Sequence, residues 1–160
     1  MRLLGVFIFY LIAIGTARAD EATQCQANGG TFLTGKVTRG PTFAPGHLHR
    51  GVELSHTHLT VLSDQDGRSY GIAIDNVFAA GYDAAGQSVP APLSTIREDD
   101  RLELCGKLFT HGGRGLDWVH TNCGKPPRPS KPDGWVKVLG PDSAPGPNLE
   151  DSQEYCRLWP

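Results

Sequence analysis

Hydrophobic and polar positions alternate along much of this chain in short runs, a pattern typical of β-strands with one buried face. The alternation is clearest over residues 52–62 and 69–74. The turn Asp64-Gln65-Asp66-Gly67 separates these two runs, and its Asp-Gly pair supplies the positive φ that a tight hairpin needs. The pattern therefore predicts an antiparallel hairpin in the first half of the chain.

Other strands are expected on both sides of this hairpin, at residues 31–37, 101–109, 116–121 and 134–139. Residues 75–81 predict a helical turn with Asp75 as its N-cap. The segments 41–50 and 125–133 are rich in proline or glycine and are expected to be loops or extended chain.

The composition favours an all-β fold with a minor helix. The chain has 20 glycines and 12 prolines, and no long segment keeps a helical apolar period. Five to six hairpin-linked strands with a short helical piece between the third and fourth predict a small, partly open barrel of the oligonucleotide/oligosaccharide-binding (OB) type, held by disulfides. A β-sandwich is the alternative architecture. Residues 20–160 are expected to form a single domain.

Residues 1–19 have the features of a signal peptide. A basic start is followed by an apolar run, and Ala17-Arg18-Ala19 places small residues where a signal peptidase acts, which predicts cleavage after Ala19. A retained membrane anchor is the alternative, but the apolar run is short for a bilayer span. We expect a periplasmic or secreted protein with no membrane association after cleavage.

The charge balance argues against a nucleic-acid partner. The chain has 15 basic and 17 acidic residues, and removing the predicted signal peptide with Arg2 and Arg18 brings the formal charge from −2 to −4. Proteins that bind nucleic acid through phosphate contacts usually carry an excess of positive charge.

Four cysteines remain after the predicted cleavage, namely Cys25, Cys105, Cys123 and Cys156. An even number in an exported protein predicts two disulfides, and three pairings are open. The expected pairing is Cys105–Cys123, because these two flank a predicted hairpin, which leaves Cys25–Cys156 to join the chain ends. The spacing fits no zinc site built from closely paired cysteines.

Three histidines are candidate metal ligands. His56 and His58 stand two residues apart, so on a strand both imidazoles face the same side. His120, or Asp117, would complete a divalent-metal site from another strand. The alternative is a solvated strand face without a cofactor.

The segment Gly115–Gly124 concentrates several chemical groups. Trp118, His120, Asp117 and the separate Tyr70 are candidate ligand-binding residues, because aromatic rings and polar groups together suit bases or sugars. The alternative is an aromatic core with structural hydrogen bonds. No catalytic residue is assigned, because Asp117 and His120 would lie on opposite faces of a strand and no nucleophile elbow is present.

The C-terminal third resembles a known family in three short motifs. These are Asp100-Arg101-Leu102-Glu103-Leu104-Cys105-Gly106, then Gly112-Gly113 with Asp117-Trp118-Val119-His120, then Asp133-Gly134-Trp135-Val136-Lys137. The pattern is similar to that of the small exported bacterial proteins grouped as the DUF3465 family. This resemblance implies an exported bacterial β-barrel and implies no particular reaction.

These observations lead to three functional hypotheses. The first is a non-enzymatic binding module for an oligosaccharide, a peptidoglycan fragment or a protein. The second is an inhibitor or immunity-type protein that blocks a secreted hydrolase through the loops at 41–50 and 125–133. The third is a metal-dependent hydrolase or nuclease that uses His56, His58 and His120.

Overall fold

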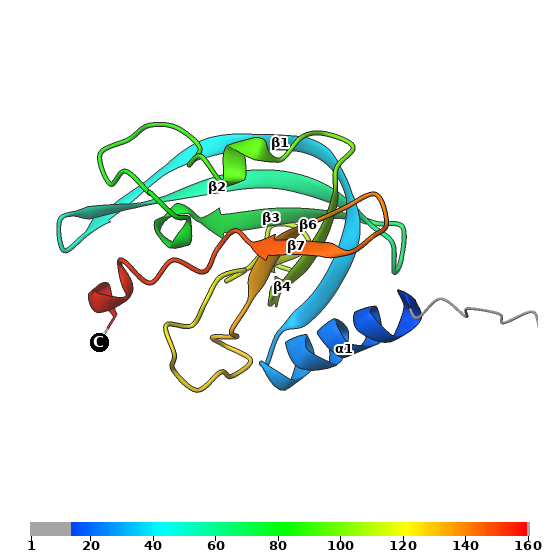
Figure 1. Ribbon diagram of the computed structural model, residues 1–160. Coiled ribbons are helices and arrows are strands. Elements are labelled where there is room, and N and C mark those ends of the chain that lie inside the picture. The colour runs from blue at the N-terminus through cyan, green and yellow to red at the C-terminus, as the bar shows by residue number, and fades with distance from the viewer. Residues whose placement is uncertain (1–13, 160) are drawn as a thin grey trace, which may run out of the picture.

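The computed structural model describes residues 14–159, with side chains from Asp20 onward (Figure 1). It is mostly β-structure, with one α-helix before a seven-stranded sheet, which confirms the predicted fold class at that level. Residues 1–13 of the predicted signal peptide lie outside the described part, so its cleavage stays a prediction. No helix within residues 14–159 has the length and apolar character needed to cross a membrane.

The helix and strands, in chain order, are α1 (Ile14–Ala27), β1 (Thr31–His49), β2 (Val52–Ser63), β3 (Ser69–Asp75), β4 (Arg101–Phe109), β5 (Gly115–Asp117), β6 (Trp135–Leu139) and β7 (Pro145–Asn148). Three short 3-10 helices, η1 (Asn76–Phe78), η2 (Leu93–Thr95) and η3 (Cys156–Leu158), join this framework. The predicted hairpin is confirmed as β2 and β3, and the predicted helical turn contains η1.

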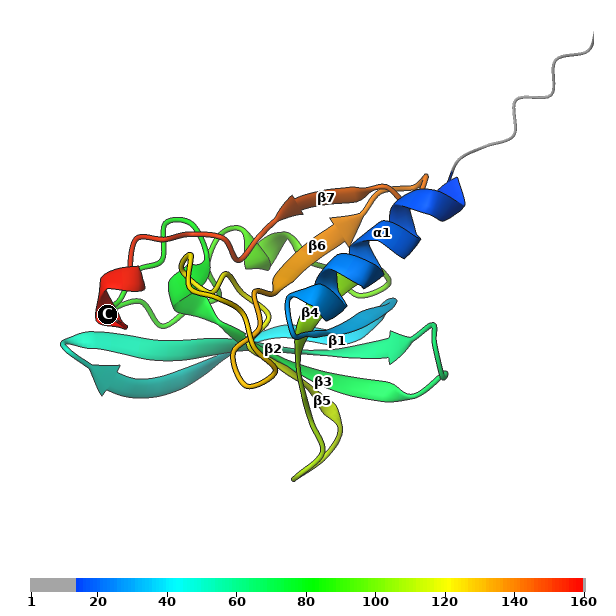
Figure 2. The same cartoon turned by 90° about the horizontal axis from the view of Figure 1, so that it is seen from below.

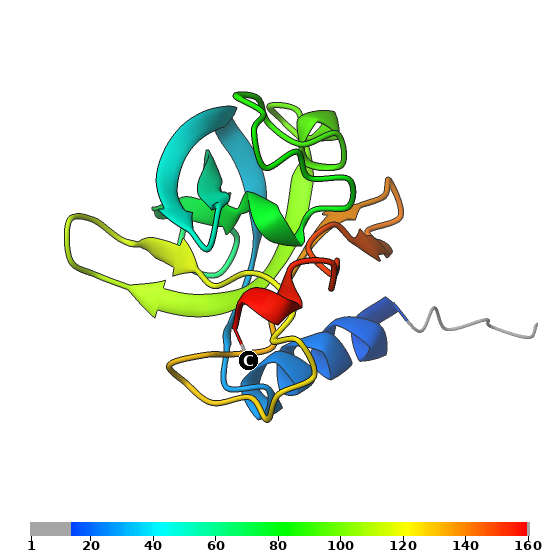
Figure 3. The ribbon, with the colours of Figure 1, turned by 90° about the vertical axis from the view of Figure 1, so that its left-hand side faces the viewer.

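The sheet closes partly into a ring. Strands β1, β2 and β3 form an antiparallel meander, and β3 pairs in parallel with β5. Strand β5 pairs with β4, and β4 returns to pair with the first residues of β1. Strands β6 and β7 extend the sheet beyond β4 (Figures 2 and 3).

The core lies inside this curved sheet. Every second residue of β2 is buried along its inner face, and the same alternation continues in β3. The buried cluster draws aliphatic side chains from the strands and from the segment between β3 and β4: Leu33, Val37, Leu59, Val61, Ile72, Ile74, Ala79, Leu93, Ile96, Leu102, Leu104, Leu116, Val119 and Val136. The outer face of β2 and β3 is therefore left for other contacts.

The prediction of a loop at residues 41–50 is wrong. Strand β1 continues to His49 and pairs with β2 along this stretch, interrupted by register shifts between Arg39 and Thr42 and between Ala44 and His47. Its pairing with β4 ends at Lys36, so beyond that point β1 has a partner on one side only. Prolines are tolerated at such edges and bulges, where their missing N–H costs no ladder bond.

The strand predicted at 116–121 is shorter than expected. Strand β5 ends at Asp117 because Trp118 adopts a φ of 53°, in the left-handed region that a strand cannot accommodate. The chain then turns beneath the start of β6. A side chain at Gly134 would collide with the carbonyl oxygens of Cys105 and Trp118, so only glycine permits this close approach.

All four cysteines form disulfides, as predicted, but the favoured pairing is wrong. The bonds are Cys25–Cys105 and Cys123–Cys156. The end of α1 lies beside β4, which places Cys25 next to Cys105. The turn at Trp118 carries Cys123 away from β4 and toward the C-terminal tail.

We expect the two disulfides to contribute unequally to stability. Cys25–Cys105 spans 80 residues of sequence and Cys123–Cys156 spans 33. Loop entropy then gives roughly 4.5 and roughly 3.7 kcal/mol as upper values for the two bonds. Urea unfolding of the double variants Cys25→Ala/Cys105→Ala and Cys123→Ala/Cys156→Ala measures both losses. A larger loss for the second pair would contradict this order.

Candidate ligand-binding site

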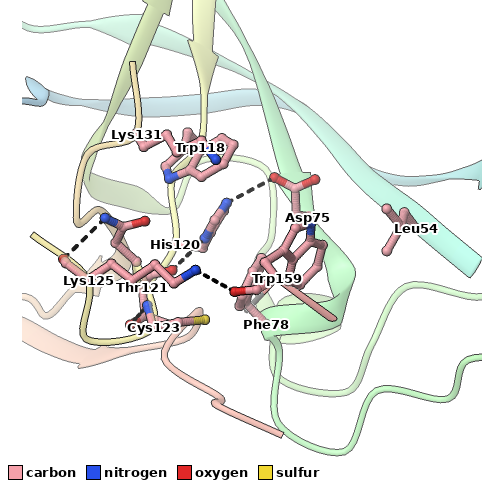
Figure 4. A pocket seen from close by; sticks show the side chains of 11 residues that line it. Leu54, Asp75, Phe78, Trp118, His120, Thr121, Cys123, Lys125, Lys131 and Trp159 are labelled. Atoms are coloured by element: carbon pink, nitrogen blue, oxygen red, sulfur yellow. Dashed lines mark hydrogen bonds and ion pairs between the residues drawn. The ribbon is translucent and has the colours of Figure 1, made fainter. Parts of the chain in front are cut away.

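A pocket of about 190 Å³ opens where β3 ends and where the chain leaves β5 (Figure 4). Its walls come from four parts of the chain: the start of β2, the β3–η1 junction, the segment after β5, and the C-terminal tail. The lining residues are Leu54, Asp75, Phe78, Trp118, His120, Thr121, Asn122, Cys123, Lys125, Lys131 and Trp159.

Asp75 is the acidic group of this pocket. It is the last residue of β3 and lies opposite His56 of β2, so both side chains share the outer face of the sheet. Its Oδ1 is 3.0 Å from Nε2 of His56, and its Oδ2 is 3.3 Å from Nε2 of His120. Asp75 occupies the N-cap position of η1, as predicted, but its carboxylate makes no capping bond and contacts the two imidazoles instead.

His120 is held on three sides. Its Nδ1 lies 2.7 Å from the carbonyl oxygen of Thr121, and its ring stacks on Phe78 with centroids 3.8 Å apart. The side chain is 3% exposed. A carbonyl and a carboxylate can only accept hydrogen bonds, so this geometry is satisfied when both ring nitrogens of His120 carry a proton.

Asp75 and His56 shift each other's pKa. Burial alone raises the pKa of Asp75, but hydrogen bonds from His120 and His56 outweigh it and hold that pKa well below its usual range. The hydrogen bond to Asp75 raises the pKa of His56. Burial and the nearby charge of His56 lower the pKa of His58, so the pKa values of these neighbouring imidazoles shift in opposite directions.

Trp118 forms an aromatic wall in a strained backbone conformation. A bulky residue at a φ of 53° is an outlier of the kind found at functional sites. Its indole Nε1 is buried and has no hydrogen-bond partner within the described chain. The ammonium group of Lys131 lies 5.5 Å from the centre of a Trp118 ring. The Trp118 residue therefore lines the pocket, while its indole nitrogen is closed off from solvent.

The C-terminal tail supplies the opposite wall. Trp159 stacks on Phe78 with ring centroids 5.4 Å apart. The ring of His49 also stacks on Trp159, with centroids 6.1 Å apart. The Nζ of Lys125 donates to the carbonyl oxygen of Trp159 at 2.5 Å. The Cys123–Cys156 disulfide ties this tail to the segment after β5, so it holds the two aromatic walls together.

A chain of buried hydrogen bonds fixes η1, and with it Asp75 and Phe78. Thr57 donates to the amide oxygen of Asn76 at 2.6 Å, and the amide nitrogen of Asn76 donates to Ser55 at 3.0 Å. The Ser55 hydroxyl then meets that of Tyr82 at 2.9 Å. Because every member has a partner, this polar network adds rigidity beside the pocket.

Glu150 is a second acid close to this site. Its side chain is fully buried, and neither carboxylate oxygen has a hydrogen-bond partner among residues 14–159. Burial, together with the charges of Asp75 and Asp151, raises the pKa of Glu150 well above its usual value. Its backbone carbonyl accepts from Thr121 N–H at 2.9 Å, so the segment that bears it supports the pocket wall.

The structure brings only some of the predicted site residues together. Trp118 and His120 line the pocket, and His56 reaches it through Asp75. His58 lies further along the same face, where its ring centroid is 6.2 Å from that of His56. Across residues 14–159, no group of three His, Cys, Asp or Glu side chains is arranged to hold a metal ion.

Tyr70 and Asp117 do not line the pocket. The Tyr70 hydroxyl donates to Asp66 at 3.0 Å near the other end of β3. Asp117 lies 3.7 Å from the Nζ of Lys107, and burial raises its pKa although Lys107 opposes this. The acid that contacts His120 is therefore Asp75 and not its near neighbour in sequence.

No protein-family model matches this chain, and no curated protein matches it. The resemblance of the C-terminal third to the DUF3465 proteins stays a prediction.

Of the residues that line the pocket, sequence reasoning assigned only Trp118 and His120 to a ligand site, and Asp75, Lys131 and Trp159 are among those it missed. Asp75 carried one usable signal, since it ends a strand next to a helical turn and faces the His56 strand across a predicted hairpin. Trp159 carried another, because it lies three residues after Cys156 and follows that disulfide. Nothing in the local sequence around Lys131 distinguishes it from other loop lysines.

We expect the substitution Asp75→Asn to lower the pKa of His56. The change removes the carboxylate that stabilises the His56 imidazolium, so its pKa falls toward the ordinary histidine value of about 6.5. An NMR titration of the histidine ring protons measures this directly. Asp117→Asn is the matched control, because Asp117 pairs with Lys107. An unchanged His56 pKa in Asp75→Asn would contradict the assignment.

Proposed function

We propose that this protein is a binding module whose pocket holds one sugar ring of a saccharide ligand. The observation that carries the proposal is the set of aromatic walls that surround a carboxylate, in one pocket of about 190 Å³. This volume lies below the roughly 300 Å³ at which sites for drug-sized ligands begin. A single ring with small polar substituents suits it better than a larger molecule.

The aromatic walls support a ring-shaped ligand. Trp118 and Trp159 come from opposite sides of the pocket, and Phe78 with its stacked His120 forms the surface between them. Rings of this kind offer large, rigid apolar faces against which the C–H face of a sugar can pack. The disulfide and the buried network at η1 keep these faces in place before the ligand arrives, which reduces the entropy cost of binding.

The polar groups of the pocket support hydroxyl recognition. Asp75 accepts hydrogen bonds, and the ammonium group of Lys131, which also lines the pocket, donates them. A sugar hydroxyl both donates and accepts, so it can satisfy the two groups together. A purely apolar ligand would cover Asp75 without offering it a hydrogen bond, which costs free energy.

The architecture and the disulfides support the wider context of this proposal. We assign the chain to the OB type of barrel because its pairings run β1-β2-β3-β5-β4 and return to β1, with β3 parallel to β5. The two disulfides favour an oxidising compartment, and therefore the periplasm or the cell exterior. The inhibitor hypothesis relied on loops at 41–50 and 125–133, but residues 41–49 belong to strand β1.

We expect binding to depend on the aromatic ring of Trp118. A panel of galacturonic acid, galactose and N-acetylglucosamine can be titrated while the indole N–H signals are followed by NMR. At least one sugar should move the signals of Trp118 and Trp159 and leave that of Trp135 in place. Trp118→Ala should weaken binding roughly tenfold or more, as expected for a lost stacking partner. Trp118→Phe should weaken it less than Trp118→Ala does, because an aromatic face remains.

Trp135→Phe is the matched control, because the Trp135 indole donates to Glu103 at 3.1 Å and does not line the pocket. If no sugar of the panel moves the Trp118 signal, or if Trp118→Ala binds as well as the native chain, the proposed function is wrong.

A further inference from the structure

A second hollow, of about 320 Å³, lies on the same sheet as the Trp118 pocket. Small residues of β3, Gly71 and Ala73, leave it open, while Arg39 of β1 and Phe109 of β4 stand at its borders. The complete lining is Arg39, Thr42, His58, Leu59, Thr60, Gly71, Ile72, Ala73 and Phe109. It combines one aromatic ring, a guanidinium, an imidazole and two threonine hydroxyls.

The two hollows share one face of the sheet. His56 is opposite Asp75, His58 is opposite Ala73, and Thr60 is opposite Gly71. Directly opposed residues of antiparallel strands point to the same side, and the burial alternation places these pairs outside the core. From Leu54 in the pocket to Thr60 in the second hollow, β2 advances roughly 20 Å. Two imidazoles, His56 and His58, occupy the surface between them.

Cations border both ends of this face. Lys125 and Lys131 line the pocket and Arg39 lines the second hollow, and none of the three forms an ion pair within residues 20–159. Asp75 is the one acid among the described residues that line either hollow, and it already contacts two imidazoles. The face is therefore locally positive although the whole chain has a formal charge of −2.

We infer that the ligand is an acidic oligosaccharide that extends from the Trp118 pocket across His56 and His58 into the hollow bordered by Arg39 and Phe109. This inference rests on the proposed function, to which it adds the length and the charge of the ligand. Carboxylates of the ligand lie near Lys131 or Lys125 at one end and Arg39 at the other. Each contact is a charge-assisted hydrogen bond of the stronger class.

A saccharide fits this face better than a single-stranded nucleic acid of similar charge. The pocket contains the carboxylate of Asp75, which accepts hydrogen bonds from hydroxyl groups, and every sugar ring of a saccharide carries such groups. The chain also lacks the overall basic excess that nucleic-acid binding through phosphates requires. An oligonucleotide is therefore one of the alternatives that the experiment separates.

Calorimetric titration of the full mature chain tests the inference. The probes are tetragalacturonic acid, its monomer galacturonic acid, the neutral tetramer maltotetraose, and a short oligothymidylate. We expect the acidic tetramer to bind about tenfold tighter than the monomer or more, because one chain occupies both hollows at once. The neutral tetramer and the oligothymidylate should bind more weakly than the acidic tetramer.

Two variants locate the second contact. Arg39→Ala and Phe109→Ala should each weaken tetramer binding several-fold and leave monomer binding unchanged, because both residues line only the second hollow. Arg68→Ala is the matched control. It removes the same charge from the turn between β2 and β3, outside both hollows.

The outcomes separate the inference from the proposed function. If the monomer binds through Trp118 but the tetramer is no tighter, or if Arg39→Ala has no effect, the inference fails and the proposed function stands. Equal binding of maltotetraose overturns the acidic character of the ligand, and tighter binding of oligothymidylate overturns its chemical class. If no saccharide binds, both proposals fail.

Discussion

The carboxylate of Asp75, held between two imidazoles, is the interaction on which the candidate site depends. Each oxygen faces one histidine nitrogen, His56 from the neighbouring strand and His120 from the segment after β5. Without such partners, the partial burial of this carboxylate would raise its pKa, because burial disfavours the charged form. The two histidines offset this effect and favour the ionised form of Asp75. The contact with His120 also holds the segment after β5 against the end of β3.

The surrounding fold positions this group through a few local devices. The register of β2 and β3 places His56 opposite Asp75, and the left-handed turn at Trp118 redirects the chain so that His120 can reach it. Gly134 allows β6 to start directly against the backbone of Trp118. The Cys123–Cys156 disulfide then brings Trp159 over Phe78. The pocket arises where these separate parts of the chain converge, which explains why no single sequence motif describes it.

The sequence predicted the elements of the fold better than their connections. Period-two alternation located β2 and β3, because each has one face in the core. Strand β4 was also predicted, although its residues 102–106 are buried without alternation. Sequence reasoning failed at β5, where the break at Trp118 depends on tertiary contacts with Gly134 and not on local preference. It also failed for the disulfides, because pairing follows from the path of the chain after β5. The acid that contacts His120 was not predicted for the same reason, since Asp75 is far from it in sequence and near in space.

Trp118 and His120 were recognisable as site residues because unusual side chains cluster around them. The cations were not recognisable, since exposed lysines and arginines occur along the whole chain and only the structure places Lys131 and Arg39 at the ends of one face. Charged side chains indicate a binding surface only when the fold shows which of them lie together.

The carboxyl carbon signal of Asp75, followed by NMR as the pH is lowered, tests the central claim most directly. The account predicts that Asp75 stays ionised to a pH well below the ordinary aspartate pKa of about 3.9, because His56 and His120 outweigh the effect of burial. Protonation of Asp75 at or above that ordinary value would show that the two imidazoles do not hold it, and would contradict the account.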